Sequence, residues 1–163
     1  MDTGDIVLHT TPRRWWIFTV SEWVHVGFVI KDPEWLDLEG VYLLESESFG
    51  VQVVPLDERI NEGSTYYRKY NGTPICHKRL QEIYQDVKDN PYVVDPWDWV
   101  KAFLGLKTHP HRENIFWCSA LVACVLTKVG ILPSNTDWSI FEPKMFGDGF
   151  HPAYGPIKKL SRM

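Results

Sequence analysis

The sequence predicts a single α+β domain in which strands come first along the chain and helices follow. Residues 6–70 contain short β-branched runs bounded by turn residues, which is the pattern of strands. Residues 74–130 instead carry apolar side chains at helical spacing. A run of strands followed by a run of helices is typical of α+β folds. A chain of 163 residues buries one sizeable core, so we expect one domain over residues 1–163.

Five strands are expected in the first half of the chain, over residues 6–8, 23–30, 41–45, 51–54 and 65–70. Only Ser46–Gly50 separates the third from the fourth, so these two should form an antiparallel hairpin. A short sixth strand is expected near Ile157. We expect the strands to form an antiparallel, barrel-like sheet.

Three helices are expected in the second half. The first covers residues 74–87, where apolar residues recur at helical spacing. Asp95 followed by Pro96 predicts the start of a second helix over residues 97–104. The third begins at Cys118, continues through an apolar stretch to residue 126 and is closed by Gly130 and Pro133. The sheet should pack against this cysteine-bearing helix.

Cys118 stands at the first position of that helix. Unpaired N–H groups at a helix N-terminus carry partial positive charge, which favours a thiolate over a thiol. A cysteine among apolar residues is also commonly a small buried hydrophobe. Cys118 is therefore a candidate nucleophile whose assignment depends on finding a base.

His25 is the candidate base, because it lies inside the strand Trp23-Val-His25-Val-Gly-Phe-Val-Ile30. It shares its strand parity with Gly27, which we expect to leave room for a substrate or for the Cys118 helix. Glu45 is the candidate orienting group, because a carboxylate at the end of an apolar strand is costly unless it has a partner. Glu47 has the same parity and is the reserve candidate. The alternative for Glu45 is a solvated hairpin end.

These segments, taken together, resemble a known family. The order Gly4-Asp5-Ile-Val-Leu, His25-Val-Gly-Phe-Val-Ile, Leu-Leu-Glu45-Ser with Gly50-Val-Gln-Val-Val-Pro-Leu, and Cys118-Ser-Ala-Leu-Val-Ala is similar to the circularly permuted NlpC-type papain-like superfamily. That superfamily includes the bacterial YiiX-like proteins and related poxvirus proteins, with lecithin retinol acyltransferase as a distant relative. In the permuted group the histidine strand precedes the cysteine helix, as here. The resemblance covers residues 4 to about 130.

The resemblance implies a permuted papain-like fold and a catalytic triad of Cys118, His25 and Glu45. It implies a cysteine-dependent hydrolase or acyltransferase that acts on an amide, ester or thioester bond through a thioester intermediate. The substrate would be a small-molecule, peptide or lipid acyl compound. The alternative is a catalytically silent scaffold of the same fold that binds a peptide, lipid or protein partner.

Several other residues have a functional and a structural interpretation. Trp15, Trp23 and Trp117 are candidate groove residues, as are Trp97 and Trp99, although packing in the core explains them equally well. Cys124 should face the core, and Cys76 is a weaker candidate for a reactive thiol. His109 and His111 are too few for a zinc site, so we expect no metal and no cofactor.

Composition limits the partners. The net charge is −4 and no basic run stands out, which argues against binding of nucleic acid. Three cysteines and no recognisable signal peptide favour a reduced, cytoplasmic setting, in the host cytoplasm if the source is viral. No apolar run is long enough for a transmembrane segment, whereas contact with a membrane surface stays open.

Overall fold

A computed structural model describes residues 1–10, 22–47, 50–61, 64–89, 117–147 and 149–161. These residues form an α+β domain with one antiparallel sheet of six strands. The strands are β1 Ile6–Thr10, β2 Trp23–Lys31, β3 Val41–Glu47, β4 Gly50–Pro55, β5 Thr65–Tyr70 and β6 Tyr154–Lys159. The α-helices are α1 Leu56–Arg59, α2 His77–Val87 and α4 Cys118–Lys128. Short 3-10 helices are η2 Glu34–Leu36, η3 Trp138–Ile140 and η4 Pro143–Phe146.

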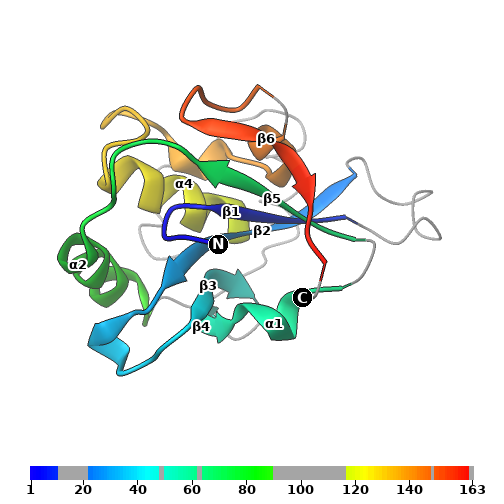
Figure 1. The fold of residues 1–163 in the computed structure, drawn as a ribbon. Helices are drawn as coiled ribbons and strands as arrows, with labels where there is room; N and C mark the ends of the chain where they lie inside the picture. The colour runs from blue at the N-terminus through cyan, green and yellow to red at the C-terminus, as the bar shows by residue number, and fades with distance from the viewer. Residues whose placement is uncertain (11–21, 48–49, 62–63, 90–116, 148, 162–163) are drawn as a thin grey trace.

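The strand order is β4-β3-β2-β1-β5-β6, with β1 in the interior of the sheet (Figure 1). The last strand, β6, pairs with β5 and so lies two strands from the first. The sheet is not closed, because β4 and β6 are its two edges among the described residues. The expectation of a barrel-like sheet is therefore wrong, although the antiparallel arrangement is confirmed.

The strands expected from the sequence are all present, and each of the first four extends at least one residue further than expected. The hairpin of β3 and β4 is confirmed, with Glu45 opposite Gln52. The helix expected over residues 74–87 begins later, at His77, because Pro74 to Cys76 have no helical structure and Cys76 is extended. The helix expected over residues 97–104 lies outside the described residues.

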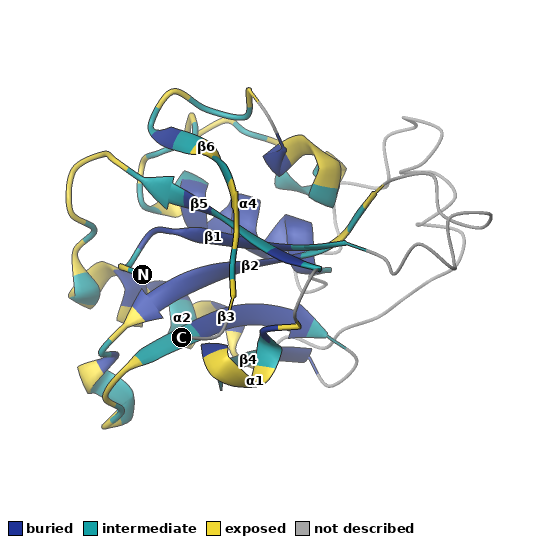
Figure 2. Ribbon diagram, turned by 45° about the vertical axis from the view of Figure 1, so that its right-hand side comes forward, coloured by how far each residue is buried: buried dark blue, intermediate teal, exposed yellow. Residues whose placement is uncertain are grey.

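Helix α4 covers one face of the sheet and forms the main core. All nine residues from Cys118 to Leu126 are buried, so the helix is apolar all round rather than on one stripe (Figure 2). Its neighbours in this core include Phe28 on β2, Leu44 on β3 and Leu80 on α2. Within the described part of the chain, no helix is both long and apolar enough to span a bilayer.

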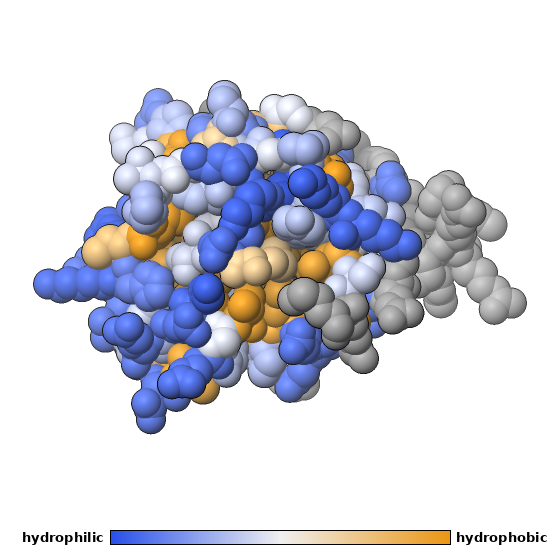
Figure 3. Space-filling model, viewed as in Figure 1, coloured by the Kyte–Doolittle hydropathy of each residue, from blue (hydrophilic) through white to orange (hydrophobic). Residues whose placement is uncertain are grey.

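A smaller core lies on the opposite face of the sheet. Val7, Val29 and Leu43 pack there against Leu56 and Ile60, which belong to α1 and to the residue that follows it. In the space-filling view, hydrophobic residues gather near the centre of the visible face and hydrophilic residues surround them (Figure 3). Alternate apolar residues of each strand thus point to opposite faces of the sheet, one set into the main core and the other into the smaller core.

A β-bulge interrupts this alternation at the start of β2. His9 pairs with His25, but Thr10 pairs with Trp23, so Val24 has no partner on β1. A bulge changes the face to which side chains point. Val24 is accordingly exposed, whereas Trp23 packs against the α4 core. His25 is the first residue of β2 after the bulge.

Two buried charged residues tie the chain ends to the sheet. The carboxylate of Asp5, fully buried, accepts hydrogen bonds from the N–H groups of Asp2 and Tyr70. Arg68 on β5 donates to the carbonyls of Gly155 and Phe146 and so fixes the segment before β6. The Gly4-Asp5 motif therefore has a structural role in this fold.

Gly27 has a different role from the one expected. A Cβ at this position would lie 2.5 to 2.7 Å from three side-chain carbons of Leu43. Gly27 therefore makes room for Leu43 in the smaller core, not for a substrate or for α4. The expected face of Gly27 was correct, but the group expected to fill the space on that face was wrong.

We predict that Gly27→Ala lowers the free energy of unfolding by about 1–3 kcal/mol, because the fully buried Leu43 cannot move away. Gly155→Ala is the matched control, since a Cβ on β6 would meet its nearest neighbour at 3.4 Å. Urea unfolding of both variants measures the difference. Adding Leu43→Ala to Gly27→Ala should recover part of the loss, and strict additivity of the two changes would contradict this account.

Candidate active site

His25 and Glu45 are brought together from neighbouring strands. His25 Nε2 lies 2.8 Å from Glu45 Oε2, within hydrogen-bond distance. The Glu45 side chain is completely buried and that of His25 is 17% exposed. A buried carboxylate therefore holds a histidine that still reaches the surface.

Three side chains bind the carboxylate of Glu45: His25, Arg59 and Gln52. Glu45 Oε1 accepts hydrogen bonds from Arg59 Nε at 2.7 Å and from Gln52 Nε2 at 3.1 Å, and Arg59 Nη2 lies 2.6 Å away. Burial by itself raises the pKa of Glu45, but the hydrogen bond and charge of His25 and the Arg59 guanidinium lower it below its usual value. Glu45 is thus an ionised group with both oxygens satisfied. It is not a solvated hairpin end.

Glu47 does not replace Glu45. Its Oε2 lies 3.2 Å from Arg59 Nη2, and its side chain is 41% exposed. Ligand atoms of His25, Glu45 and Glu47 do lie within 4.8 Å of one another, which is a spacing that suits a metal ion. The Arg59 guanidinium already binds both carboxylates there, so a cation would have to displace a fixed positive charge. The geometry favours an ion-pair network over a metal site.

Cys118 is the first residue of α4, as expected. The first backbone hydrogen bond at this end runs from Leu121 N–H to the Trp117 carbonyl at 3.0 Å, so the preceding amides have no intrahelical acceptor. Two side chains fix this helix start, because Trp117 Nε1 and Ser119 Oγ both donate to the Phe141 carbonyl, at 3.1 and 2.6 Å. Cys118 is 8% exposed and free of any disulfide.

Cys118 and Glu45 both act on the ring of His25. Burial alone would lower the pKa of His25, but the hydrogen bonds and charges of Cys118 and Glu45 outweigh burial and raise it to about 10. Since Nε2 faces Glu45, Nδ1 is the ring nitrogen left for the Cys118 thiol. The structure thus pairs His25 with Glu45 and places Cys118 close enough to affect the pKa of His25.

The charge of His25 also affects the stability of the fold. Its folded pKa lies above the ordinary value of 6.5, so the folded state binds this proton more tightly than the unfolded chain. The resulting stabilisation is complete below about pH 6.5 and is lost as the pH rises through about 10. Protonation of His25 and folding therefore favour each other.

His9 is a site residue that the sequence analysis missed. It lies directly opposite His25 on β1, and the two ring centroids are 5.5 Å apart. Burial, followed by the charge of His25, lowers the pKa of His9 to about 4. Arg59 and Gln52 were missed as well. The one signal in the sequence was that Gln52 lies on the strand expected to form a hairpin with the Glu45 strand; the structure places the two residues opposite each other.

The other candidate residues have mixed outcomes. Trp23 and Trp117 are half-buried beside the main core, on the same elements as His25 and Cys118. Cys124 is buried in the core as expected, and burial raises the pKa of its thiol. The remaining candidates lie outside the described residues: Trp15, Trp97, Trp99, His109 and His111.

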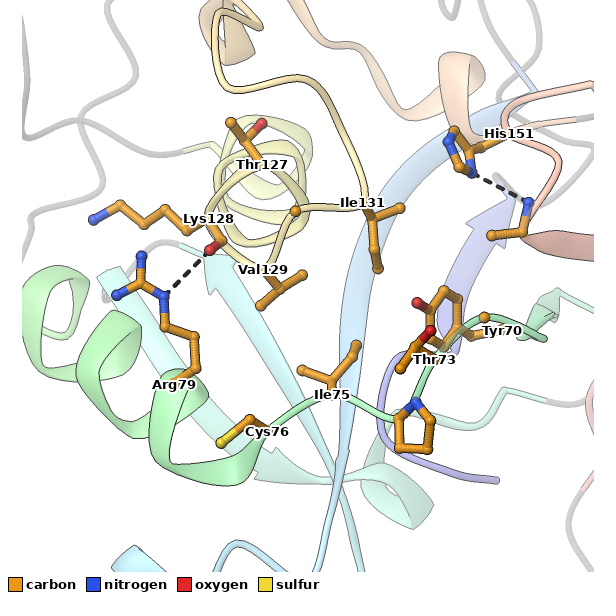
Figure 4. A pocket seen from close by; sticks show the side chains of 14 residues that line it. Tyr70, Thr73, Ile75, Cys76, Arg79, Thr127, Lys128, Val129, Ile131 and His151 are labelled. Carbon is orange, nitrogen blue, oxygen red and sulfur yellow. Dashed lines mark hydrogen bonds between the residues drawn. The ribbon is translucent and has the colours of Figure 1, made fainter.

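A separate pocket of about 750 Å³ lies at the other end of α4. Ile75, Val129 and Ile131 point into it, and the exposed Cys76 lies at its rim (Figure 4). The Arg79 side chain donates to the Lys128 carbonyl beside it, at 3.3 Å. Since Cys118 is at the opposite end of the helix, Cys76 and this pocket are not part of the candidate site.

Comparison of the chain with protein-family models, curated proteins and solved structures found no match. The chemistry of the site is therefore inferred from its own residues. Those residues include a buried acid, a charged histidine and a cysteine at a helix start.

We predict that Arg59→Met lowers the free energy of unfolding at pH 7 by about 1–3 kcal/mol, because it removes charged hydrogen bonds from buried Glu45. Arg59 helps to lower the pKa of Glu45, so its contribution is present above pH 4.5 and is lost as the pH falls through the lower, folded value. Urea unfolding at pH 7 and pH 3.5 compares the two states. Arg79→Met, at a residue with a 51% exposed side chain, is the control. Equal losses for the two variants would contradict the role of Arg59.

Proposed function

We propose that this protein is a cysteine-dependent hydrolase or acyltransferase that cleaves an amide, ester or thioester acyl bond. The observation that carries the proposal is the pairing of buried Glu45 with His25, whose pKa is raised by both Glu45 and Cys118, the first residue of α4. A nucleophile, a base and a group that orients the base are the three parts of such a site. Here Cys118 as the nucleophile comes from α4, His25 as the base from β2, and Glu45 as the orienting group from β3.

The first step forms an acyl-enzyme. His25 Nδ1 takes the proton of Cys118, and the sulfur attacks the acyl carbonyl carbon. The proton on His25 then passes to the leaving nitrogen, oxygen or sulfur as the bond to the acyl carbon breaks. Glu45 stabilises the imidazolium throughout, because it holds Nε2 at 2.8 Å.

The second step releases the acyl group. Water or another acceptor gives a proton to His25 and attacks the thioester, and that proton returns to the Cys118 sulfur. The backbone amides at the start of α4 that have no intrahelical acceptor support the proposal, because they suit the negative charge on the tetrahedral oxygen. The Trp117 and Ser119 contacts to the Phe141 carbonyl hold those amides in place.

The fold that suits this proposal is a permuted papain-like one. Supporting it are an antiparallel sheet, a histidine strand that precedes the cysteine helix, and the packing of α4 against β2 and β3. Trp23 and Trp117 would flank the bound acyl group. A small-molecule, peptide or lipid acyl compound remains the proposed substrate class.

A catalytically silent scaffold that binds a partner is the alternative. It has no need of an ionised, fully buried Glu45 with a charged histidine, because buried charge is costly unless it is used or well paired. The four contacts of Glu45 satisfy it structurally, so the discriminating property is the reactivity of Cys118. That reactivity is measurable without knowing the substrate.

We predict that iodoacetamide alkylates Cys118 faster than Cys76 at pH 6, although Cys76 is exposed and Cys118 is buried. An isolated thiol has a pKa of about 8.5 and is almost unreactive at pH 6. In the proposed mechanism His25 takes the proton of Cys118, so Cys118 should react at pH 6 only while His25 is in place. Mass spectrometry of peptides from samples quenched at pH 4 to 10 gives each rate in the same molecule.

Two variants and one control complete this experiment. His25→Ala should make the rate at Cys118 fall by at least about tenfold at pH 6, where an unassisted thiol is mostly protonated. Cys118→Ala and His25→Ala should each abolish turnover of p-nitrophenyl acyl esters. Cys76→Ala, which changes the distant pocket, should leave turnover intact. If Cys118 reacts no faster than Cys76 and ignores His25→Ala, the scaffold alternative is favoured.

A further inference from the structure

A row of polar side chains crosses the sheet beside the candidate site. Cα pairing places Thr65 on β5 opposite His9 on β1, and His9 opposite His25 on β2. Thr65 Oγ1 lies 3.4 Å from His9 Nδ1, and the His9 and His25 rings are 5.5 Å apart and tilted by 44°. His25 then binds Glu45 on β3. The row therefore joins four adjacent strands, and His9 is the titratable member that the proposed mechanism does not use.

The hydrogen bonds of Thr65 assign the tautomer of His9. Thr65 Oγ1 accepts a hydrogen bond from the N–H of Asn61 at 2.9 Å. We assign its single proton to the Asn61 carbonyl at 3.2 Å, because that oxygen is closer than His9 Nδ1 at 3.4 Å. Nδ1 of His9 must then be the donor to Thr65, because the hydroxyl has no second proton. This leaves Nε2 unprotonated in the neutral ring.

His9 Nε2 is buried and has no hydrogen-bond partner among the described residues. Protonating it would place a bare N–H⁺ in a buried position, next to the ring of His25. The charged groups that act on His9 from the packed elements are His25 on β2, Glu45 on β3 and Arg59 on α1. Two of these three are positive when the site is active, so the surroundings of His9 favour its uncharged form.

We propose that His9 is a positioning residue that packs as an uncharged ring against His25 and allows the His25 imidazolium to form. Thr65 and Asn61 fix the ring of His9 from one side, and the ring of His25 contacts it on the other. The role rests on the proposed function, because it concerns the proton that His25 receives from Cys118. His9 itself touches neither the thiol nor a substrate in this account.

The proposal makes a quantitative claim about charge at position 9. With an effective dielectric constant of about 20, a second positive charge at 5.5 Å shifts the protonation equilibrium of His25 by a factor on the order of 100. A neutral side chain of similar size at position 9 would leave this equilibrium nearly unchanged. The sign of the charge, more than the volume of the side chain, should therefore decide the state of His25.

Nitrogen-15 NMR of the histidine side chains in the full chain tests both parts of the proposal. In the wild-type protein at pH 7, His9 should show a protonated Nδ1 and an unprotonated Nε2, and the opposite tautomer would overturn the assignment. His9→Gln and His25→Gln identify the two sets of signals. The variants compared are His9→Gln, which is neutral, and His9→Lys, which carries a permanent charge.

His25 should lose its proton near pH 10 in the wild-type protein and within about half a pH unit of that in His9→Gln. In His9→Lys it should lose its proton about two pH units lower, matching the hundredfold shift. Val24→Lys is the matched control, because it adds the same charge at an exposed residue next to His25 and should shift the titration far less. Circular dichroism verifies that each variant is folded.

The outcomes separate this inference from the proposed function. If His9→Lys and Val24→Lys shift His25 equally, or neither shifts it, the role of His9 is overturned while an activated Cys118 can still stand. If His25 in the wild-type protein titrates near 6.5, the charged pair of the proposed function fails, and the difference between the two lysine variants still decides the role of His9. Should His9→Lys not fold, the tautomer in the wild-type protein and the His9→Gln titration carry the test.

Discussion

The burial of one ionised carboxylate organises the site. Glu45 is fully buried, and an isolated charge there would cost several kcal/mol unless it were compensated. Its compensation comes from three partners, on β2, β4 and α1, which fixes the positions of these elements around the two carboxylate oxygens of β3. The orientation of His25 follows from that arrangement, because one of its nitrogens is already committed to Glu45.

The charges in the network around Glu45 also offset one another. Arg59 offsets the charge of Glu45 permanently, and His25 offsets it further when protonated. Glu47 binds the outer side of Arg59 and is partly hydrated, so the network ends at the solvent. A histidine in such a network can carry a proton at neutral pH although it is mostly buried.

The elements of the fold were predictable from the sequence because their signals are local. The β-branched alternation around His25 and the apolar stretch after Cys118 each fit one type of element. The sequence named Glu45 and His25 as partners, but the pairing of their strands, β2 and β3, was seen only in the structure. Whether the sheet closes was not predictable in the same way, because closure depends on how the edge strands are placed.

The residues that surround Glu45 and His25 carry no comparable local pattern in the sequence. Arg59 belongs to a helix of four residues, which is too short to show periodicity. His9 extends a short apolar strand and acquires its role only through a neighbour 16 positions along the chain. Gly27 was placed on the correct face, but the side chain that fills its space comes from another strand. Contacts between distant segments decided all three.

The order of the elements along the chain has a consequence for synthesis on the ribosome. Everything that holds and charges His25, apart from the thiol, lies before residue 66, whereas Cys118 opens the last α-helix described. At about 5–20 residues per second, several seconds separate the emergence of the two parts. During that time the sheet face destined for α4 lacks the helix that covers most of it, and a nascent chain holds His25 and Glu45 without Cys118. The three residues of the candidate site therefore come together only when α4 docks.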